Sequence, residues 1–167
     1  KVTEPVVLPL PDEKGMLSVN SIPEIRELLP KMDAVLFGCG SGLGSGTEAV
    51  LEFLLEHCEV PLILDADGIT LAAKHMDLLR DRAYPTILTP HDGEFLRLAP
   101  VSGQRQPQTM ELAQRLGVVL LRKGYRTLIT DGEICWENQT GNPGMAVGGS
   151  GDVLAGIIAG LLGQGLS

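Results

Sequence analysis

The sequence predicts an α/β fold with an open, mostly parallel sheet covered by helices on both faces. Short apolar runs alternate with helical segments along most of the chain, which is the pattern of βαβ units. Glycine and polar residues follow the predicted strands at their carboxyl ends, where α/β proteins bind ligands. Of the 21 glycines in 167 residues, 5 lie between Gly38 and Gly46 and 9 between Gly141 and Gly165. This clustering indicates two places where the backbone approaches something closely.

The predicted elements follow in a regular order. Prolines at 5, 9 and 11 predict a loop or an edge strand, after which a capping box, Ser21-Ile22-Pro23-Glu24, predicts a helix that ends at Pro30. Apolar runs predict strands at residues 34–37, 62–64, 86–88 and 118–121, and Asp131-Gly132 predicts a hairpin of residues 127–130 and 134–136. Helical patterns predict helices at residues 47–57, 69–80, 94–98, 107–116 and 152–162.

The composition is typical of one acidic globular domain, taken as residues 1–167. The net charge is −8 and 44% of the residues are hydrophobic. This charge argues against nonspecific nucleic-acid binding and against an anionic membrane surface, because no basic stripe is present. The three cysteines form no CxxC pair, which favours a cytoplasmic location and no structural zinc site. The apolar segment 153–162 is shorter than the ~20 residues of a membrane span.

The first glycine window follows the strand predicted at 34–37. A dinucleotide fingerprint occurs only in the relaxed form, at Gly44, Gly46 and Ala49, with Asp65 at a suitable distance for a ribose contact. Because that match begins well after the strand, the interpretation as a Rossmann oxidoreductase is disfavoured. A loop whose bare backbone lets a bulky ligand approach is the better functional interpretation.

Three further candidate positions each have two interpretations. His91, at a strand end, hydrogen-bonds a ligand or caps the next helix, and the sequence favours neither interpretation over the other. Asp65 and Asp67 bind a metal or cap helices, the second being favoured. Lys123 and Arg126, beside a glycine, hold a polyphosphate or belong to the solvated surface, again about equally.

The second glycine window carries most of the functional argument. Gly148, Gly149 and Gly151 lead into a predicted helix whose first turn contains Asp152. Free backbone N–H groups at a helix N-terminus bind anions, and an Asp placed there can deprotonate an attacking hydroxyl. The alternative is that Asp152 only caps the helix, which the glycine density makes less attractive. The arrangement is kinase-like but lacks the GxxxxGK[ST] of a P-loop.

These motifs together resemble the ADP/ATP-dependent NAD(P)H-hydrate dehydratases, a family with a ribokinase-like, three-layer αβα fold. The resemblance covers about residues 33–167. It rests on the glycine loop after Asp33-Ala34-Val35, LILDADGITLAA at 62–73, TPHDGEFLRL at 89–98, RKGYRTLITDG at 122–132, and NPGMAVGGSGDVLAGIIAGLLGQG at 142–165. The last motif is close to diagnostic, and all five stand in the family order.

The resemblance implies an enzyme that uses ADP or ATP, with Mg²⁺, to dehydrate the hydrated form of NADH or NADPH. The NPGMA form is similar to the bacterial branch that prefers ADP. Asp152 matches the catalytic Asp, which also contacts the substrate, and Gly42 and His91 match substrate-binding positions. The matches to adenine-nucleotide contacts are Lys123, Gly124, Tyr125, Arg126, Thr127 and Gly151. No residue is assigned to a metal.

The sequence also departs from the family pattern. Ser41 stands where many members have proline, which leaves Gly40 and Gly44 as alternatives to Gly42 for the substrate contact. The family domain extends beyond both ends of the matched region, so we expect the sequence to be truncated at both ends and to lack an epimerase domain.

We expect a homo-oligomer. We also expect Gly156, Gly160, Gly163 and Gly165 to permit close helix packing. The alternatives are another ribokinase-like kinase, of the hydroxymethylpyrimidine or thiazole type, and a non-catalytic nucleotide-binding fragment.

Overall fold

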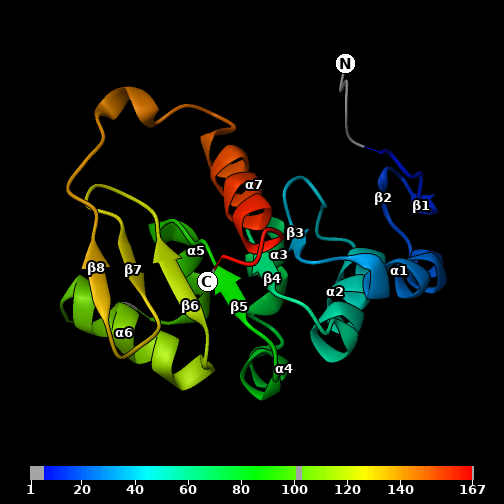
Figure 1. Cartoon of the computed structure of the whole chain (residues 1–167), viewed down its shortest axis with the longest axis horizontal. Coiled ribbons are helices and arrows are strands. Elements are labelled where there is room, and N and C mark those ends of the chain that lie inside the picture. The colour runs from blue at the N-terminus through cyan, green and yellow to red at the C-terminus, as the bar shows by residue number, and fades with distance from the viewer. Residues whose placement is uncertain (1–5, 101–102, 167) are drawn as a thin grey trace.

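The fold is a six-stranded sheet with helices on both faces, seen in a computed structural model that describes residues 6–100 and 103–166 (Figure 1). The strands lie in chain order across the sheet. They are β3 (Val35–Phe37), β4 (Leu62–Leu64), β5 (Thr86–Leu88), β6 (Val119–Arg122), β7 (Leu128–Thr130) and β8 (Cys135–Glu137). Strands β3 to β6 are parallel, and β7 and β8 are antiparallel. The predicted mostly parallel sheet is therefore confirmed.

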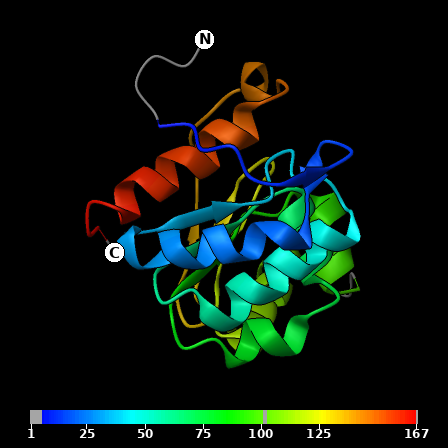
Figure 2. The ribbon, with the colours of Figure 1, turned by 90° about the vertical axis from the view of Figure 1, so that its right-hand side faces the viewer.

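The helices form the two outer layers. They are α1 (Ile22–Leu28), α2 (Ser45–His57), α3 (Asp67–Ala72), α4 (Met76–Asp81), α5 (Asp92–Leu98), α6 (Arg105–Leu116) and α7 (Ser150–Leu162). Helix α7 lies on one side of β3, and α1 and α2 lie on the other (Figure 2). This arrangement is the three-layer αβα fold that the resemblance implied. No helix in residues 6–100 and 103–166 is long and apolar enough to cross a membrane.

The core lies between the sheet and the helices that connect its parallel strands. Leu62 and Leu64 pack in it with Leu51 of α2 and Phe95 of α5, all of them fully buried. Ile63 is also fully buried although it lies outside that cluster. Alternate residues of a strand face opposite sides, and α7 contacts β4. Burial on both faces explains why this strand is a continuous apolar run.

The single helix predicted at 69–80 is wrong, because the segment forms two helices, α3 and α4. His75 lies at the break, with a non-helical backbone (φ −123°, ψ 41°). Its Nε2 lies 3.0 Å from a carboxylate oxygen of Glu48 and 3.3 Å from one of Glu52, both on α2. Lys74 also binds Glu48, at 2.8 Å. These long-range contacts favour the break, which apolar spacing alone does not reveal.

The predicted capping box at the start of α1 is also wrong. The helix begins at Ile22, but Ser21 makes no side-chain cap hydrogen bond. Its hydroxyl instead donates to the carbonyl of Pro11 at 2.6 Å, which fastens the preceding segment to the helix. That segment contains a short hairpin, β1 (Asp12–Glu13) with β2 (Met16–Leu17), where the sequence predicted a loop or edge strand. The proline at position 5 lies outside the described residues.

The expected packing role of the later glycines holds at neither position inside α7. A methyl group built on Gly156 or Gly160 would meet no atom within 4 Å among the described residues. On Gly163, which ends the helix, it would lie 3.4 Å from the carbonyl oxygen of Ala159. The two mid-helix glycines therefore do not allow any close approach that the structure describes.

Candidate active site at the carboxyl edge of the parallel strands

The carboxyl ends of the parallel strands bring residues from four loops together beside the start of α7. Cys39 follows β3, Asp65 follows β4, His91 follows β5 and Lys123 follows β6. An isolated parallel bridge joins His91 to Lys123, and the Lys123 N–H donates to the carbonyl of Pro90 at 2.7 Å. The predicted convergence of polar residues at one edge of the sheet is confirmed for these positions.

Asp65 is the buried centre of this cluster, with only 1% of its surface exposed. Its Oδ1 accepts hydrogen bonds from Lys123 Nζ and from the Thr89 hydroxyl, both at 2.7 Å. Burial acts to raise the pKa of Asp65, but the hydrogen bonds from Lys123 and Thr89 outweigh it, so the pKa is lowered. Asp65 is therefore a buried carboxylate whose charge is matched by Lys123. Helix α3, which follows Asp65, has no side-chain cap hydrogen bond, so the favoured interpretation of Asp65 as a helix cap is wrong.

Asp152 lies in the first turn of α7, and its carboxylate lies close to Asp65 and Cys39. Ligand-type atoms of Cys39, Asp65 and Asp152 all lie within 4.8 Å of one another. Burial, and the nearby charges of Asp65 and Asp152, raise the pKa of the Cys39 thiol to about 11. Cys39 is thus a neutral thiol at pH 7, and its Sγ lies 3.8 Å from Asp65 Oδ2, to which it donates. Asp152 is exposed, which leaves its carboxylate accessible to a ligand.

The start of α7 presents free backbone donors. The cap residue is Gly149, with φ +85°, and no side chain caps the helix. No hydrogen bond from a side chain caps the described helix end, although the charge of Asp152 in the first turn suits the helix dipole. Within the described chain, no hydrogen-bond acceptor is found for the N–H groups of Gly151 and Asp152. Such donors, together with the helix dipole, suit an anion.

A glycine at position 151 lets Lys123 approach this helix end. A methyl group built on Gly151 would lie 3.3 Å from Lys123 Nζ and 3.7 Å from Asp65 Oδ2. Lys123 also lies 4.0 Å from Glu94 Oε2. The ammonium group is therefore placed between two buried carboxylates and the free amides of α7.

His91 has the capping role that the sequence left open. Its Nδ1 accepts from the Glu94 N–H at 3.1 Å, while the Glu94 carboxylate accepts from the His91 N–H at 2.8 Å. This reciprocal capping box begins α5. The His91 side chain is still 57% exposed, so the cap leaves much of the ring open toward solvent. A contact with substrate is compatible with this geometry and stays a prediction.

The first glycine window is organised by contacts inside the protein. The Gly42 N–H donates to Asp67 Oδ2 at 2.9 Å, which ties the loop to the start of α3. A methyl group on Gly38, whose φ is +119°, would lie 1.9 Å from the carbonyl oxygen of Asp65. Asp67 therefore stabilises the loop, and the absence of a side chain at Gly38 allows β3 and β4 to meet closely.

The segment 123–127 connects β6 to β7 beyond the site. Tyr125 is 89% exposed, and Arg126, with φ +55°, lies 3.3 Å from the Glu137 carboxylate. The Thr127 hydroxyl donates to the Gly124 carbonyl at 3.1 Å. Of the two cations in this segment, Lys123 faces the site and Arg126 forms an ion pair with Glu137 of β8.

The sequence alone assigned no role to Cys39, Thr89 or Glu94. Cys39 and Thr89 nevertheless follow strands, as the assigned residues do.

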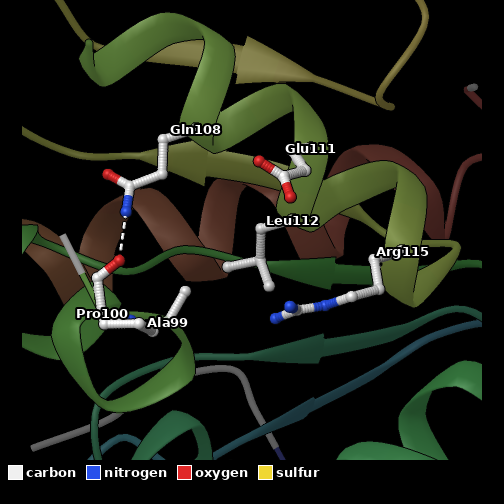
Figure 3. A pocket seen from close by; sticks show the side chains of 6 residues that line it. All are labelled: Ala99, Pro100, Gln108, Glu111, Leu112 and Arg115. Atoms are coloured by element: carbon white, nitrogen blue, oxygen red, sulfur yellow. Dashed lines mark hydrogen bonds between the residues drawn. The ribbon is translucent and has the colours of Figure 1, made fainter. Parts of the chain in front are cut away.

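A small depression of about 140 Å³ lies elsewhere, between α5 and α6 (Figure 3). Gln108 donates to the Pro100 carbonyl across it. None of its lining residues belongs to the cluster around Asp65. It does not compete with that cluster as the candidate active site.

Comparison with known proteins identifies the family and agrees with this fold. The family model described as NAD(P)H-hydrate dehydratase matches residues 7–167. The chain therefore belongs to the NAD(P)H-hydrate dehydratase family. Its relatives include proteins named bifunctional NAD(P)H-hydrate repair enzyme Nnr from Moorella thermoacetica, 40% identical over 99% of this chain, and from Gloeobacter violaceus, 41% identical over 98%. The chain spans about a third of the length of these curated relatives, 33% and 32%.

Two solved structures share the fold. A ribokinase-like superfamily protein from Enterococcus faecalis V583 aligns with a TM-score of 0.77 and 33% identity, over 87% of this chain and 52% of that one. A hypothetical protein from Streptococcus mutans aligns with a TM-score of 0.74 and 30% identity, over 86% of this chain and 53% of that one. The fold is thus ribokinase-like.

Proposed function

We propose that this chain carries the catalytic site of an ADP- or ATP-dependent NAD(P)H-hydrate dehydratase. Its substrate is the hydrated form of NADH or NADPH, and its product is the repaired dinucleotide. The observation that carries the proposal is the meeting of three features at one edge of the sheet. These are the exposed carboxylate of Asp152, the free amides at the start of α7, and the ammonium of Lys123.

Asp152 is the general base of the proposed reaction. The ring hydroxyl of the hydrate gives its proton to Asp152, and its oxygen attacks the terminal phosphoryl group of the nucleotide. An O–P bond forms as the bond to the departing nucleotide breaks. The amides of Gly151 and Asp152 and the charge of Lys123 offset the negative charge that builds up on the phosphoryl oxygens. Phosphate then leaves with the C–O bonding electrons, and the adjacent ring carbon gives a proton to water, so that its C–H electrons form the restored double bond.

The remaining predicted residues have roles in binding. We assign Gly42 and His91 to the hydrate, and residues 123–127 with Gly151 to the adenine nucleotide. The position of His91 beside Lys123 supports a shared crevice, because a bridge joins the two residues. The positive charge at Lys123 and the open helix end at Gly151 suit the phosphates rather than the nicotinamide ring.

Mg²⁺ fits this site as a companion of the nucleotide. Carboxylate oxygens of Asp65 and Asp152 are the hard donors of the cluster, whereas the thiol of Cys39 is a soft donor that Mg²⁺ does not favour. Mg²⁺ commonly binds through one or two carboxylates together with substrate phosphates. When bound, it supplies charge neutralisation for the phosphoryl group.

The proposal is tested on the complete gene product. Chemically hydrated NADH is incubated with ADP or ATP and Mg²⁺, and the return of absorbance at the NADH band is followed. Recovery that requires nucleotide supports a dehydratase. A stable phosphorylated product without recovery would support a ribokinase-like kinase instead. A thermal shift with nucleotide but no turnover would support a nucleotide-binding module.

We also infer a preference for ADP, a cytoplasmic location and a homo-oligomeric state from the sequence. Initial rates with each nucleotide test the first inference. Cell fractionation tests the second, and light scattering of the purified protein tests the third.

A further inference from the structure

One arginine outside the proposed catalytic groups holds the segment after β6. Arg105 is the first residue of α6, and its guanidinium reaches four backbone carbonyls. Nη1 donates to Tyr125 O at 3.1 Å and to Arg126 O at 2.8 Å. Nη2 donates to Arg122 O at 3.2 Å and to Lys123 O at 3.1 Å. A planar fork with several donors suits this multiple contact, which a single ammonium group cannot reproduce.

The guanidinium is oriented for these carbonyls rather than for the neighbouring carboxylate. Arg105 Nε is buried without a hydrogen-bond partner among the described residues, and the Asp92 carboxylate lies 3.5 Å from it. Asp92 instead accepts from Arg122 Nε at 2.7 Å. Burial acts to raise the pKa of Asp92, but Arg122 and Arg105 outweigh it and lower the pKa, which keeps this side chain charged. The Nη1 and Nη2 donors of Arg105 thus bind backbone carbonyls of residues 122–126.

The segment has an unusual shape that these contacts support. Gly124 has φ +146° and Arg126 has φ +55°, so the backbone turns twice through conformations that most residues avoid. A methyl group on Gly124 would lie 3.0 Å from Arg105 Nη2. Glycine at position 124 therefore lets the Arg105 guanidinium lie close to the backbone.

Fixing the carbonyls also fixes the direction of the amides. In a trans peptide, the N–H points away from the C=O of the same unit, and the described backbone contains no cis peptide bond. The carbonyls of Lys123 and Tyr125 point at Arg105, so the N–H groups of Gly124 and Arg126 point away from it. Neither N–H has a hydrogen-bond acceptor in the part of the chain that the structure describes. They are free donors for a ligand on the other side of the segment.

We propose that Arg105 is a positioning residue for nucleotide binding, which shapes residues 123–127 through their carbonyls without touching the nucleotide. This inference rests on the proposed function only for the identity of the ligand. It predicts that the affinity for ADP depends on the fork of Arg105, whereas the chemical step at Asp152 does not. Because the Lys123 ammonium group is held by Asp65 and not by Arg105, loss of the fork should raise KM for the nucleotide more than it lowers kcat.

The test compares Arg105→Lys with Arg115→Lys in the complete gene product. Arg115 is an exposed residue of the same helix and serves as the matched control. We expect Arg105→Lys to weaken ADP binding by about tenfold or more in calorimetry, while the control binds like the original protein. KM for ADP should rise by a similar factor, with KM for the hydrate unchanged. Unchanged ADP affinity in a folded Arg105→Lys protein would overturn the proposal.

A second measurement needs no variant. Hydrogen exchange of the peptide that contains residues 123–127 should slow when ADP is added to the original protein, because its free amides become donors to the ligand. Unchanged exchange at saturating ADP would overturn the proposal even if Arg105→Lys does not fold. Both measurements report binding, so an absence of hydrate turnover contradicts the proposed function and leaves the inference on Arg105 to be decided separately.

Discussion

The two glycine-rich windows look alike in the sequence but do different work in the structure. In the first window, glycines allow backbone to meet backbone: a methyl group on Gly38 would strike Asp65 O at 1.9 Å, and one on Gly46 would strike Leu17 O at 2.3 Å. In the second window, Gly148 and Gly149 have no neighbour within 4 Å in the described structure. The fold therefore requires glycine at positions 38 and 46, whereas Gly148 and Gly149 lie where the backbone is open to a ligand.

This difference shows what glycine density can and cannot indicate. Both windows predict close backbone approach, but only the structure tells whether the approaching group belongs to the protein. In the first window, the approaching groups belong to the protein: the backbone after β4 contacts Gly38, and the backbone of β2 contacts Gly46. In the second window, Gly148, Gly149 and Gly151 lie at the start of a 13-residue helix, where the N–H groups of Gly151 and Asp152 have no acceptor among the described residues. Substitutions in the two windows should therefore separate stability from activity.

The largest expected effect is the loss of stability in Gly38→Ala. The added methyl group collides with fixed backbone, and φ is +119°, so the free energy of unfolding should fall by roughly 3 to 5 kcal/mol. Urea denaturation measures it. Gly40→Ala is the control, since its φ is +67° but no atom of the described residues lies within 4 Å, and it should cost only ~1 kcal/mol. Equal costs would show that backbone crowding is not what requires glycine at 38.

The next effect concerns the ion pair beside the second window. Asp65→Asn removes the charge that matches Lys123 and should lower the free energy of unfolding by roughly 2 to 3 kcal/mol at pH 7. The pKa of Asp65 is lowered below its ordinary 3.8 in the folded state. The pair therefore stabilises the native state fully above that pH, and this contribution is lost as the pH falls through the folded-state value.

Denaturation of both proteins between pH 7 and pH 3 checks this dependence. The difference between them should stay constant in the upper part of the range and shrink below the ordinary pKa of 3.8. A difference that grows on acidification would contradict the assignment of Asp65 as an ionised, paired carboxylate.

A smaller effect on stability is expected within α7, where activity should change instead. Gly151→Ala places a methyl group 3.3 Å from Lys123 Nζ, which must shift, so nucleotide-dependent turnover should fall by about tenfold. The free energy of unfolding should change by less than ~1 kcal/mol, because the helix gains from alanine what the crowding costs. Gly156→Ala, in the open middle of the helix, is the control. It should gain up to ~1 kcal/mol and keep its turnover, whereas equal loss of turnover in both variants would argue against a special role for position 151.

Much of this fold could be predicted because its elements are local. Apolar runs placed β4 and β5 at their observed bounds, since strands buried on both faces leave a clear pattern. The break at His75 and the hydroxyl bond of Ser21 to Pro11 could not be predicted, because each depends on residues far away in the sequence. For the same reason, the hydrogen bonds from Arg105 to the carbonyls of residues 122–126 could not be predicted. The strand ends predicted that Asp65 and Lys123 lie at one edge of the sheet, but not that the two side chains form an ion pair there.

The central claim is that the second window, with Asp152, performs chemistry on a nucleotide. The most direct measurement compares Asp152→Asn with the original protein in the hydrated-NADH assay, with ADP affinity measured alongside. Loss of a general base should lower turnover by about 10²- to 10⁴-fold while ADP affinity stays within about threefold. Retained turnover, or turnover lost only because ADP no longer binds, would contradict the role assigned to Asp152.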